Sequence, residues 1–579
     1  MNRAFLLIVF LLTLLPLIYF PNPGHDALLI PFNIFLWEIA AASIFFAGLY
    51  IYKHQVLVLP RHTMLILALP VGMVVSGFIT GLDRPVDWMF RLATILMGLL
   101  FFFSLFQFQA NRRTLDNAVY IILGGLLLNG VIAFLQTLPG RPLFGLIPHP
   151  ETPRAVGVFM QPNILASVMV TGVVLSLYQL STPGFNQRSL LLKTLTLTTL
   201  FVCSFIVMIT GSRIGLVALV LSVPLVVAAR FTLLRRTPVK ALLAVALLVL
   251  GTGSGIATSD GFWKATSKLE QLADEGRDAR PHLYRIAWDL YTDKPLAGHG
   301  IGSFQRVFHD RAAEYLEARG GEPLIGHARF SHPHNELLFW AIEGGSLALL
   351  GIVAILSATL MQLYRLGWQR GGAMLAILLP ITLHTQVELP FYSSMYHWLL
   401  FLFLGFLVFR PLQRYRWLNW PSAALIPIPA ATTALLLATV MFCTTTFGTS
   451  RDLTRFLLYK EINLDELRAA QDNLYFNEFA TMLTLKALLN QDLTQGTQHW
   501  TQIYIDWIET YLLHTPETSS FHDLALAYHH LGMTGNAEAT IERGLYLFPQ
   551  HPVISSSYQK LEEREPLLAA STPEGSQAQ

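Results

Sequence analysis

Residues 331–356, "SHPHNELLFWAIEGGSLALLGIVAIL", set two histidines, an asparagine and a glutamate directly before a long apolar run. About 20 mainly apolar residues suffice for a helix to cross a bilayer. The run from 337 to 361 therefore predicts a membrane span with a polar cluster at one of its ends.

Apolar runs of similar length recur along the whole chain. They lie near 5–20, 27–51, 63–80, 88–108, 117–137, 163–180, 189–210, 213–229, 239–256, 372–387, 393–409 and 423–445. With the run at 337–361 they predict an all-α fold, a polytopic membrane helical bundle of about 13 transmembrane helices. The composition agrees, because 53% of the residues are hydrophobic and 13% are charged, whereas a soluble domain carries about 25% charged residues.

The charge and cysteine content exclude other classes. The formal net charge of +2 gives no reason to expect a nucleic-acid partner. Cys203 and Cys443 both fall inside apolar runs, which favours core or lipid-facing positions over a disulfide. The run at 5–20 is followed by no small-residue cleavage site, so we interpret it as an uncleaved span rather than a signal peptide.

The basic residues of the loops predict the orientation. Lys and Arg gather in alternate loops, and the positive-inside rule puts those loops in the cytoplasm. One long loop and the C-terminal tail then lie outside. The predicted domains are N-terminal transmembrane helices at 1–256, a large external loop at 257–336, C-terminal transmembrane helices at 337–445, a helical domain at 446–565 and a disordered tail at 566–579.

The helical domain contains a repeat-like segment, "FHDLALAYHHLGMTGNAEATIERGLYLFP" at 521–549. Small alanines sit at close-packing positions, Gly532 and Gly535 flank the expected turn, and Pro549 is expected to end the second helix. The segment is similar to a tetratricopeptide (TPR) unit. A helical cap on the membrane domain and a docking module for an acceptor protein both remain open.

Four arginines are expected on the external side of the membrane: Arg154, Arg213, Arg280 and Arg285. A single arginine there could simply extend to lipid headgroups. Several together favour a polyanionic ligand, because the guanidinium fork binds phosphate oxygens in a bidentate way. A lipid diphosphate would meet them at that depth.

The histidine cluster predicts a general base. Pro333 suits the first turn of a helix, so His334 would project from a helix N-terminus, where the partial positive charge disfavours the imidazolium. A neutral imidazole near pH 7 can accept a proton, and Asn335 and Glu336 could orient it or bind the acceptor. A capping histidine without chemistry is one alternative. A metal site built from His332, His334 and Glu336 is another, weakened by the lack of a fourth ligand nearby.

Two further pairs are expected to bind the acceptor or to support the site. Gln161 and Asn163 flank Pro162 at the start of an apolar run, where they could also simply begin a helix. His384 and Glu388 are spaced four residues apart and would share one helical face. A purely structural hydrogen-bonded pair is the alternative for these two residues.

These stretches together resemble the bacterial O-antigen ligase and polymerase superfamily over roughly residues 90–410. The most specific part is "HPHNELLFWAIEGG", and "GVFMQPNILA", "TGSRIGL" and "PLAGHGIGSF" recur in the expected order. Within the superfamily, "HTQVELPFY" is similar to the His-x-x-x-Glu-x-Pro signature of protein O-oligosaccharyltransferases, the pilin glycosylation ligases. One departure concerns the usual Arg-x-x-x-Trp: Tyr284 follows Arg280 at that spacing, and Trp288 follows Arg285 three residues on.

The resemblance implies the activity. The glycan donor would be an undecaprenyl-diphosphate-linked oligosaccharide in the bacterial inner membrane, with its diphosphate held by the arginines on the periplasmic face. His334 would take the proton of a Ser or Thr hydroxyl on a periplasmic acceptor such as pilin, in one inverting displacement without cofactor or metal. An O-antigen ligase that uses lipid A–core as acceptor and an O-antigen polymerase are the sibling alternatives. A lipid-linked glycan transporter is the alternative from another class, expected to carry its polar groups near mid-membrane in repeated, broken helices.

Overall fold

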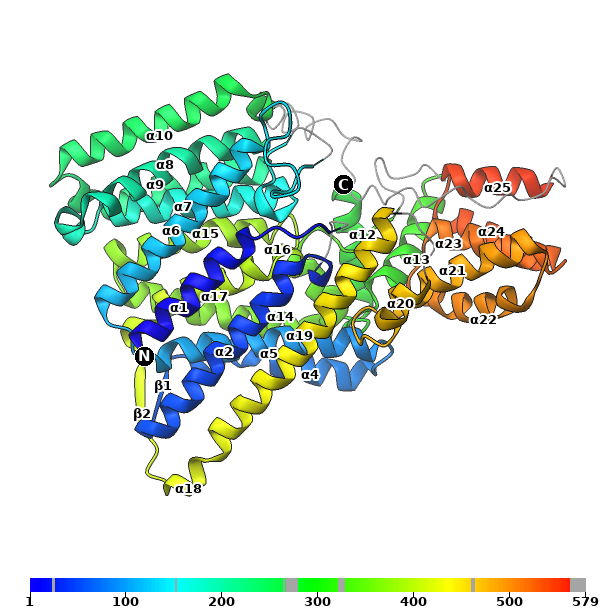
Figure 1. Cartoon of the computed structure of the whole chain (residues 1–579), viewed down its shortest axis with the longest axis horizontal. Coiled ribbons are helices and arrows are strands. Elements are labelled where there is room, and N and C mark those ends of the chain that lie inside the picture. Colours follow the sequence, from blue (N-terminus) through cyan, green and yellow to red (C-terminus); the bar gives the residue numbers. More distant parts are fainter. Residues whose placement is uncertain are drawn as a thin grey trace. The chain divides into compact units, whose positions relative to one another are not determined.

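The computed structural model describes residues 1–22, 27–150, 154–263, 266, 280–320, 329–459 and 464–562. Helices make up almost all of its regular structure, joined by one small antiparallel sheet of β1 (Val56–Leu59) and β2 (Arg414–Trp417) (Figure 1). In the described part, 11 helices are long and apolar enough to cross a membrane. The prediction of an all-α, polytopic membrane protein is confirmed.

The count of about 13 spans stays a prediction, because two of the apolar runs form shorter helices. The run at 5–20 gives α1 (Asn2–Leu14), and the run at 372–387 gives α15 (Ala373–His384).

The chain divides into two compact units. The first comprises Met1–Pro70, Ala93–Ala273 and Gly351–Ser450; the second comprises Val71–Leu92, Asp274–Leu350 and Arg451–Gln579. Among the described helices, four contribute residues to both units: α4 (Ala68–Thr80), α5 (Pro85–Gln107), α14 (Glu336–Arg365) and α19 (Pro427–Tyr459).

The first unit is a bundle of apolar helices around α7 (Pro162–Leu180). Nearly every α7 side chain is buried, as expected of a helix that is apolar on all sides. Helix α7 packs against α8 (Leu190–Thr210), α9 (Arg213–Leu234) and α15. A Cβ on Gly215 would lie 2.7 Å from the Cβ of Ala166, so small residues bring α9 close to α7.

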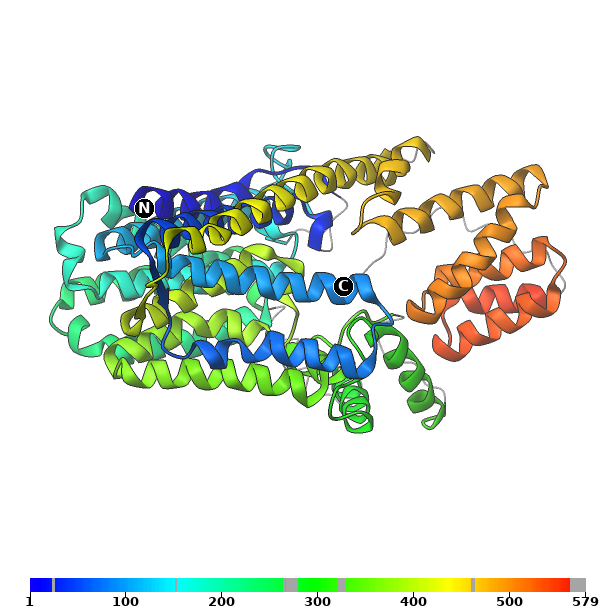
Figure 2. The same cartoon turned by 90° about the horizontal axis from the view of Figure 1, so that it is seen from below.

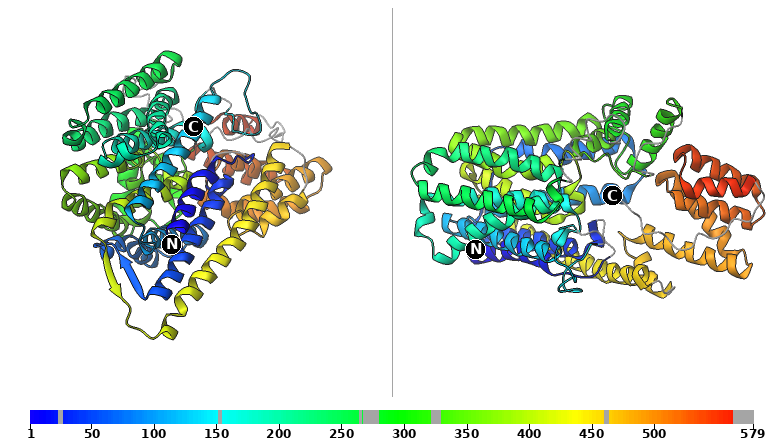
Figure 3. Two further views of the ribbon diagram at one scale, coloured as in Figure 1. Left: turned by 60° about the vertical axis from the view of Figure 1, so that its left-hand side comes forward. Right: turned by 90° about the horizontal axis from the view of Figure 1, so that it is seen from above.

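Further apolar helices of the first unit are α2 (Pro31–His54), α6 (Arg112–Leu135), α10 (Pro238–Thr258) and α17 (Met395–Phe409). Of these, α6 and α10 pack against α8, α17 packs against α15, and α2 packs against α17. Figure 3 shows α6 to α10 running alongside one another. In lipid a helix satisfies its backbone hydrogen bonds internally, which is why these apolar runs fold as helices.

The second unit contains the end of α4 (Ala68–Thr80), the loop helices α12 (Arg280–Asp293) and α13 (Phe304–Glu317), the start of α14, and the tail. The tail helices follow one another in an antiparallel succession (Figure 2). They are α20 (Leu464–Gln471), α21 (Asn477–Gln495), α22 (His499–His514), α23 (Thr518–His530), α24 (Thr534–Leu547) and α25 (Pro552–Glu562). The core shared by α21 to α25 includes Tyr504, Ile508, Ala525, Ile541 and Ile554.

The repeat-like segment forms the helical hairpin α23–α24. Gly532 takes φ +73° in the turn, the left-handed conformation that glycine adopts without steric cost. Gly535 lies inside α24 rather than beside the turn, and α24 ends at Leu547, two residues before Pro549. The likeness to a tetratricopeptide unit stays a prediction, and residues 566–579 lie outside the described residues.

Helix α13 packs into the tail. Ala313 belongs to the tail core, the His309 ring lies 4.9 Å from the Phe548 ring, and Arg543 pairs with Asp310. Described parts of the predicted loop and of the predicted tail domain therefore share one core. The predicted domain boundaries stay predictions.

Candidate functional site

The polar cluster precedes α14 and is closed by an asparagine cap. The Asn335 side-chain oxygen accepts a hydrogen bond from the Leu338 N–H at 3.0 Å, and the helix begins at Glu336. Asparagine is among the preferred N-cap residues because its oxygen satisfies a backbone donor of the first turn. The expectation that Pro333 lies in the first turn is wrong, because His334, which lies between Pro333 and the helix, has φ +51°, outside the helical region.

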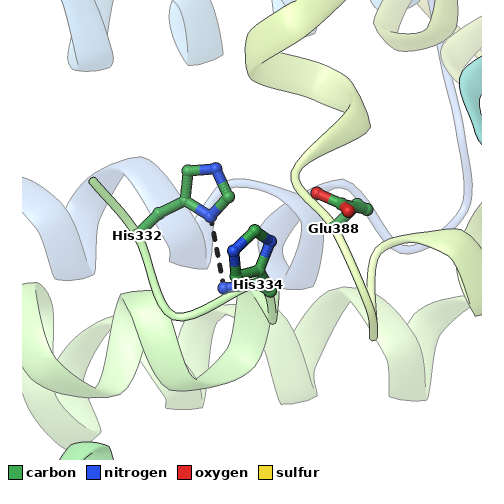
Figure 4. Close-up of side chains that lie close together, drawn as sticks. All are labelled: His332, His334 and Glu388. Carbon is green, nitrogen blue, oxygen red and sulfur yellow. Dashed lines mark hydrogen bonds between the residues drawn. The ribbon is translucent and has the colours of Figure 1, made fainter. Parts of the chain in front are cut away.

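His332 and His334 form a tight turn (Figure 4). The backbone N–H of His334 donates to Nδ1 of His332 at 3.2 Å, and the two ring centroids lie 4.4 Å apart. A nitrogen that accepts a hydrogen bond carries no proton, so this bond selects the neutral His332 tautomer protonated on Nε2. A positive φ is uncommon for a residue other than glycine, and such conformations gather at functional sites. The turn thus constrains the backbone of His334, whose side chain is half-buried.

The side chain of Glu336 bonds along its own helix. Its Oε1 accepts from Nε1 of Trp340 at 3.0 Å, one helical turn further on. His332 and His334 supply two imidazoles, fewer than the three protein ligands of a typical catalytic zinc site. The alternative of a metal site built from His332, His334 and Glu336 stays a prediction.

Helix α14 opens at Gly345, where φ is +58°, and the loop at 295–300 bonds to the opened turn. The N–H groups of His299 and Gly300 donate to the carbonyls of Ile342 and Glu343 at 2.8 and 3.1 Å. In return, the carbonyls of Pro295 and Leu296 accept from the N–H groups of Ser346 and Leu347 at 2.8 and 3.1 Å. The loop therefore satisfies backbone groups that the break in α14 frees.

We call this backbone contact between the loop at 295–300 and residues 342–347 of α14 the interlock. Two glycines make it possible. A Cβ on Gly298 would lie 2.6 Å from the carbonyl oxygen of Ile342. A Cβ on Gly345 would lie 2.5 Å from the Gly298 nitrogen and from the Leu296 oxygen. The motifs "PLAGHGIG" and "EGG" therefore meet in one close backbone contact.

A buried ion pair lies next to the interlock. Glu343, with a side chain only 1% exposed, accepts from Nη1 of Arg91 at 2.8 Å and from the backbone N–H of Gly302 at 3.1 Å. The Arg91 guanidinium also lies over the Phe339 ring, 4.6 Å from its centroid. Neither charged residue was predicted from the sequence. A glutamate inside an apolar run was the available signal, because such a charge is costly unless it is paired.

Two predicted arginines belong to the same unit as the histidines. Arg280 is the first residue of α12 and is half-buried; Arg285 lies within the same helix and is exposed. The opposite face of α12 is buried through Leu283 and Ile286. The choice between Arg280 and Arg285 as the diphosphate contact stays open.

The other two arginines lie in the first unit, at the α8–α9 turn. A Cβ on Gly211, which ends α8, would lie 3.6 Å from Nη2 of Arg154, and Arg213 begins α9 two residues later. The hydroxyl of Ser212, the N-cap of α9, donates to the Asn163 side-chain oxygen at 2.8 Å. The structure thus gathers Arg154, Asn163 and Arg213 at one turn.

Gln161 is the N-cap position of α7, and Asn163 follows Pro162 in its first turn. Both are half-buried. The expected helix start is therefore present, and Asn163 has the additional bond to Ser212.

The expectation that His384 and Glu388 share a helical face is wrong. Helix α15 ends at His384, so Glu388 lies beyond it, before Pro390 begins the short α16 (Pro390–Ser393). The fully buried His384 bonds through Nδ1 to the Ser167 hydroxyl at 2.9 Å. The same hydroxyl lies 3.2 Å from Nε2 of the buried His397, so one serine joins α7, α15 and α17.

Two family models match the chain. The first, described as O-antigen ligase, matches residues 198–353, and the second, described as the C-terminal part of a virulence factor membrane-bound polymerase, matches residues 373–561. These matches support the O-antigen ligase/polymerase superfamily. Its members are membrane enzymes that transfer glycans as ligases or polymerases, which implies a lipid-linked glycan donor. No curated protein matches the chain.

The matched ranges cover most of the candidate residues. The ligase match includes Arg213, Arg280, Arg285 and the histidine turn together with the interlock. The polymerase match runs from the start of α15 into α25, so it includes His384 and the tail helices. The matches support the superfamily resemblance over these ranges, and the narrower likeness to pilin glycosylation ligases stays a prediction.

Proposed function

We propose that this protein transfers a preassembled glycan from undecaprenyl diphosphate to Ser or Thr hydroxyls of periplasmic proteins such as pilin. The observation that carries the proposal is the constrained turn at His332–His334, directly before α14 and within the O-antigen ligase match. A transferase of this kind needs a positioned base for the acceptor hydroxyl, and an imidazole suits that task near neutral pH.

In this mechanism His334 takes the proton as the acceptor oxygen attacks the anomeric carbon. The bond between that carbon and the diphosphate oxygen breaks, and its electron pair stays on the diphosphate. Arg213 and Arg154, with Arg280 or Arg285, stabilise the charge that develops on the leaving group. Inversion at the anomeric carbon follows from a single displacement.

The supporting residues keep the roles that the motifs suggest. His332, Asn335 and Glu336 shape the turn before α14, through hydrogen bonds within that turn and along the helix. We propose that four further residues bind the acceptor or position the arginines that hold the diphosphate: Gln161, Asn163, His384 and Glu388. The site would face the periplasm from the inner membrane.

The sibling activities are the second candidates, because the matching families are described as a ligase and a polymerase. An O-antigen ligase would use lipid A–core as acceptor, and a polymerase would use another lipid-linked glycan. Both would share the glycan-donor site and differ in the acceptor.

The test co-expresses the protein with a lipid-linked glycan pathway and a candidate pilin, and follows the pilin mass. We expect a glycan-dependent mass increase that His334→Ala abolishes at equal expression. His499→Ala is the matched control, because it removes an exposed histidine of the same unit and should change nothing.

Other outcomes point elsewhere. Glycan found on lipid A–core would identify a ligase, and longer lipid-linked glycans would identify a polymerase. A fully active His334→Ala variant would rule out the proposed base.

A further inference from the structure

The second unit contains a cavity of about 500 Å³ beside the interlock. Its lining comes from the end of α4, from Asp83, from the loop at 294–299 and from Arg306 at the start of α13. Small-molecule sites typically measure about 300–1,000 Å³, so the cavity has the size of a ligand site.

The cavity wall is fixed by the backbone contacts around it. The Ser76 hydroxyl on α4 donates to the carbonyl of Ala297 at 2.7 Å. On its other side the loop is held by the close contact between Gly298 and Gly345. A site on such a frame exists before the ligand arrives, which lowers the entropic cost of binding.

The lining combines cations with hydrogen-bonding groups. Lys294 and Arg306 supply two positive charges, and Asp83, 3.6 Å from Arg306, supplies one negative charge, which leaves a net charge of +1 with a neutral His299. His299 donates from Nε2 to the Leu290 carbonyl at 2.9 Å, so in the neutral ring Nδ1 is an acceptor. Burial lowers the pKa of His299, which favours that neutral form.

This combination matches the chemistry of an acidic sugar. Sugar hydroxyls both donate and accept, and they can pair with the His299 ring and with Asp83. Pro295 and Ala297 add apolar surface for a ring face. A carboxylate or phosphate on the sugar would pair with Lys294 and Arg306.

We propose that this cavity binds an acidic sugar residue of the glycan that the protein transfers. The inference rests on the proposed function. The loop contacts α14 at Ile342 and Glu343, and Ile342 lies six residues along α14 from Glu336, the first residue of the helix, which itself follows His334. That stretch of helix alone is about 9 Å long at 1.5 Å per residue. The bound sugar is therefore not the one at the reacting carbon, and its binding energy positions the glycan from a distance.

A binding experiment tests the cavity without requiring catalysis. The full-length protein in detergent micelles is titrated with a disaccharide that contains glucuronic acid, and with its neutral glucose counterpart, by saturation-transfer NMR. We expect the acidic disaccharide to bind at least fivefold more tightly. Lys294→Gln and Arg306→Gln should each weaken its binding at least fivefold and leave the neutral disaccharide unchanged.

The matched control is Arg319→Gln, which removes an exposed cation of the same unit that does not line the cavity. It should leave the affinity for the acidic disaccharide unchanged. Equal binding of the two disaccharides, or full affinity in both lining variants, would overturn the proposal.

The outcome is separable from that of the pilin assay. Acid-selective binding that depends on Lys294 and Arg306, without glycan transfer to any acceptor, would establish the acidic-sugar cavity and refute the proposed function. Pilin modification without acid-selective binding would support the proposed function and refute the acidic-sugar cavity.

Discussion

Removing the arginine of the buried Arg91–Glu343 pair should be strongly destabilising. In Arg91→Met the Glu343 carboxylate, 1% exposed, keeps the backbone N–H of Gly302 but loses the guanidinium that lies 2.8 Å away. Breaking a buried pair by removing one partner costs about 3–5 kcal/mol, because an uncompensated charge stays buried. That is a large part of the roughly 5–15 kcal/mol by which folded proteins are stable.

A second substitution separates the charge from the packing. In the double variant Arg91→Met with Glu343→Gln no charge is left buried at this pair, and the new side-chain amide keeps an oxygen for the Gly302 N–H. We therefore expect the double variant to recover at least half of the lost stability. Arg91 and Glu343 are in contact, so their effects should not add.

The assay is chemical or thermal unfolding of the full-length protein in detergent micelles, with all variants under one condition. The coupling between the two sites should reach about 2 kcal/mol or more, within the range known for residues in contact. A loss below about 1 kcal/mol in Arg91→Met, or a double variant no more stable than the single one, would refute the reasoning.

Three further predictions concern other parts of the chain. Gly298→Ala should lower the unfolding temperature by several degrees and reduce transfer at least tenfold, since its Cβ would lie 2.6 Å from a backbone oxygen. Gly320→Ala is the matched control: Gly320 has φ +82° and open space around it, so this change should lower the stability by only about 1 kcal/mol. Equal losses of stability in the two variants would contradict the interlock. Burial, more than nearby Arg329, lowers the pKa of His309 to about 3, so the unfolded state binds the proton first below pH 6.5. Stability should then fall by about 2 kcal/mol between pH 6.5 and pH 5, and His309→Phe should flatten that slope in melting curves. Ser167→Ala should cost about 1–3 kcal/mol, because two buried imidazoles lose a shared partner. Ser176→Ala is its control, because that buried hydroxyl has no hydrogen-bond partner among the described residues. An equal loss of stability in Ser176→Ala would show that the bonds of Ser167 to the two histidines do not stabilise the fold.

The site itself was partly predictable. Asn335 is an N-cap by residue type and by its place before an apolar helix, and the structure has it in that role. The sequence could not predict the left-handed turn at His334, because the favourable bond that accompanies it comes from the His332 ring. The helical pairing of His384 with Glu388 failed because α15 ends at His384, where its imidazole meets a serine of another helix.

The sequence by itself determined the membrane-spanning helices, because an apolar stretch of about 20 residues is a local property that needs no tertiary partner. It also located the polar cluster before α14 and the glycine motifs. Only the tertiary structure decided that Gly298 meets Gly345, that Arg91 neutralises Glu343, and that α13 packs into the tail core. The physical reason is the same in each case. The partners of a broken helix and of a buried charge come from segments that lie far away in the sequence. No spacing along the chain encodes which of these segments the folded protein brings into contact.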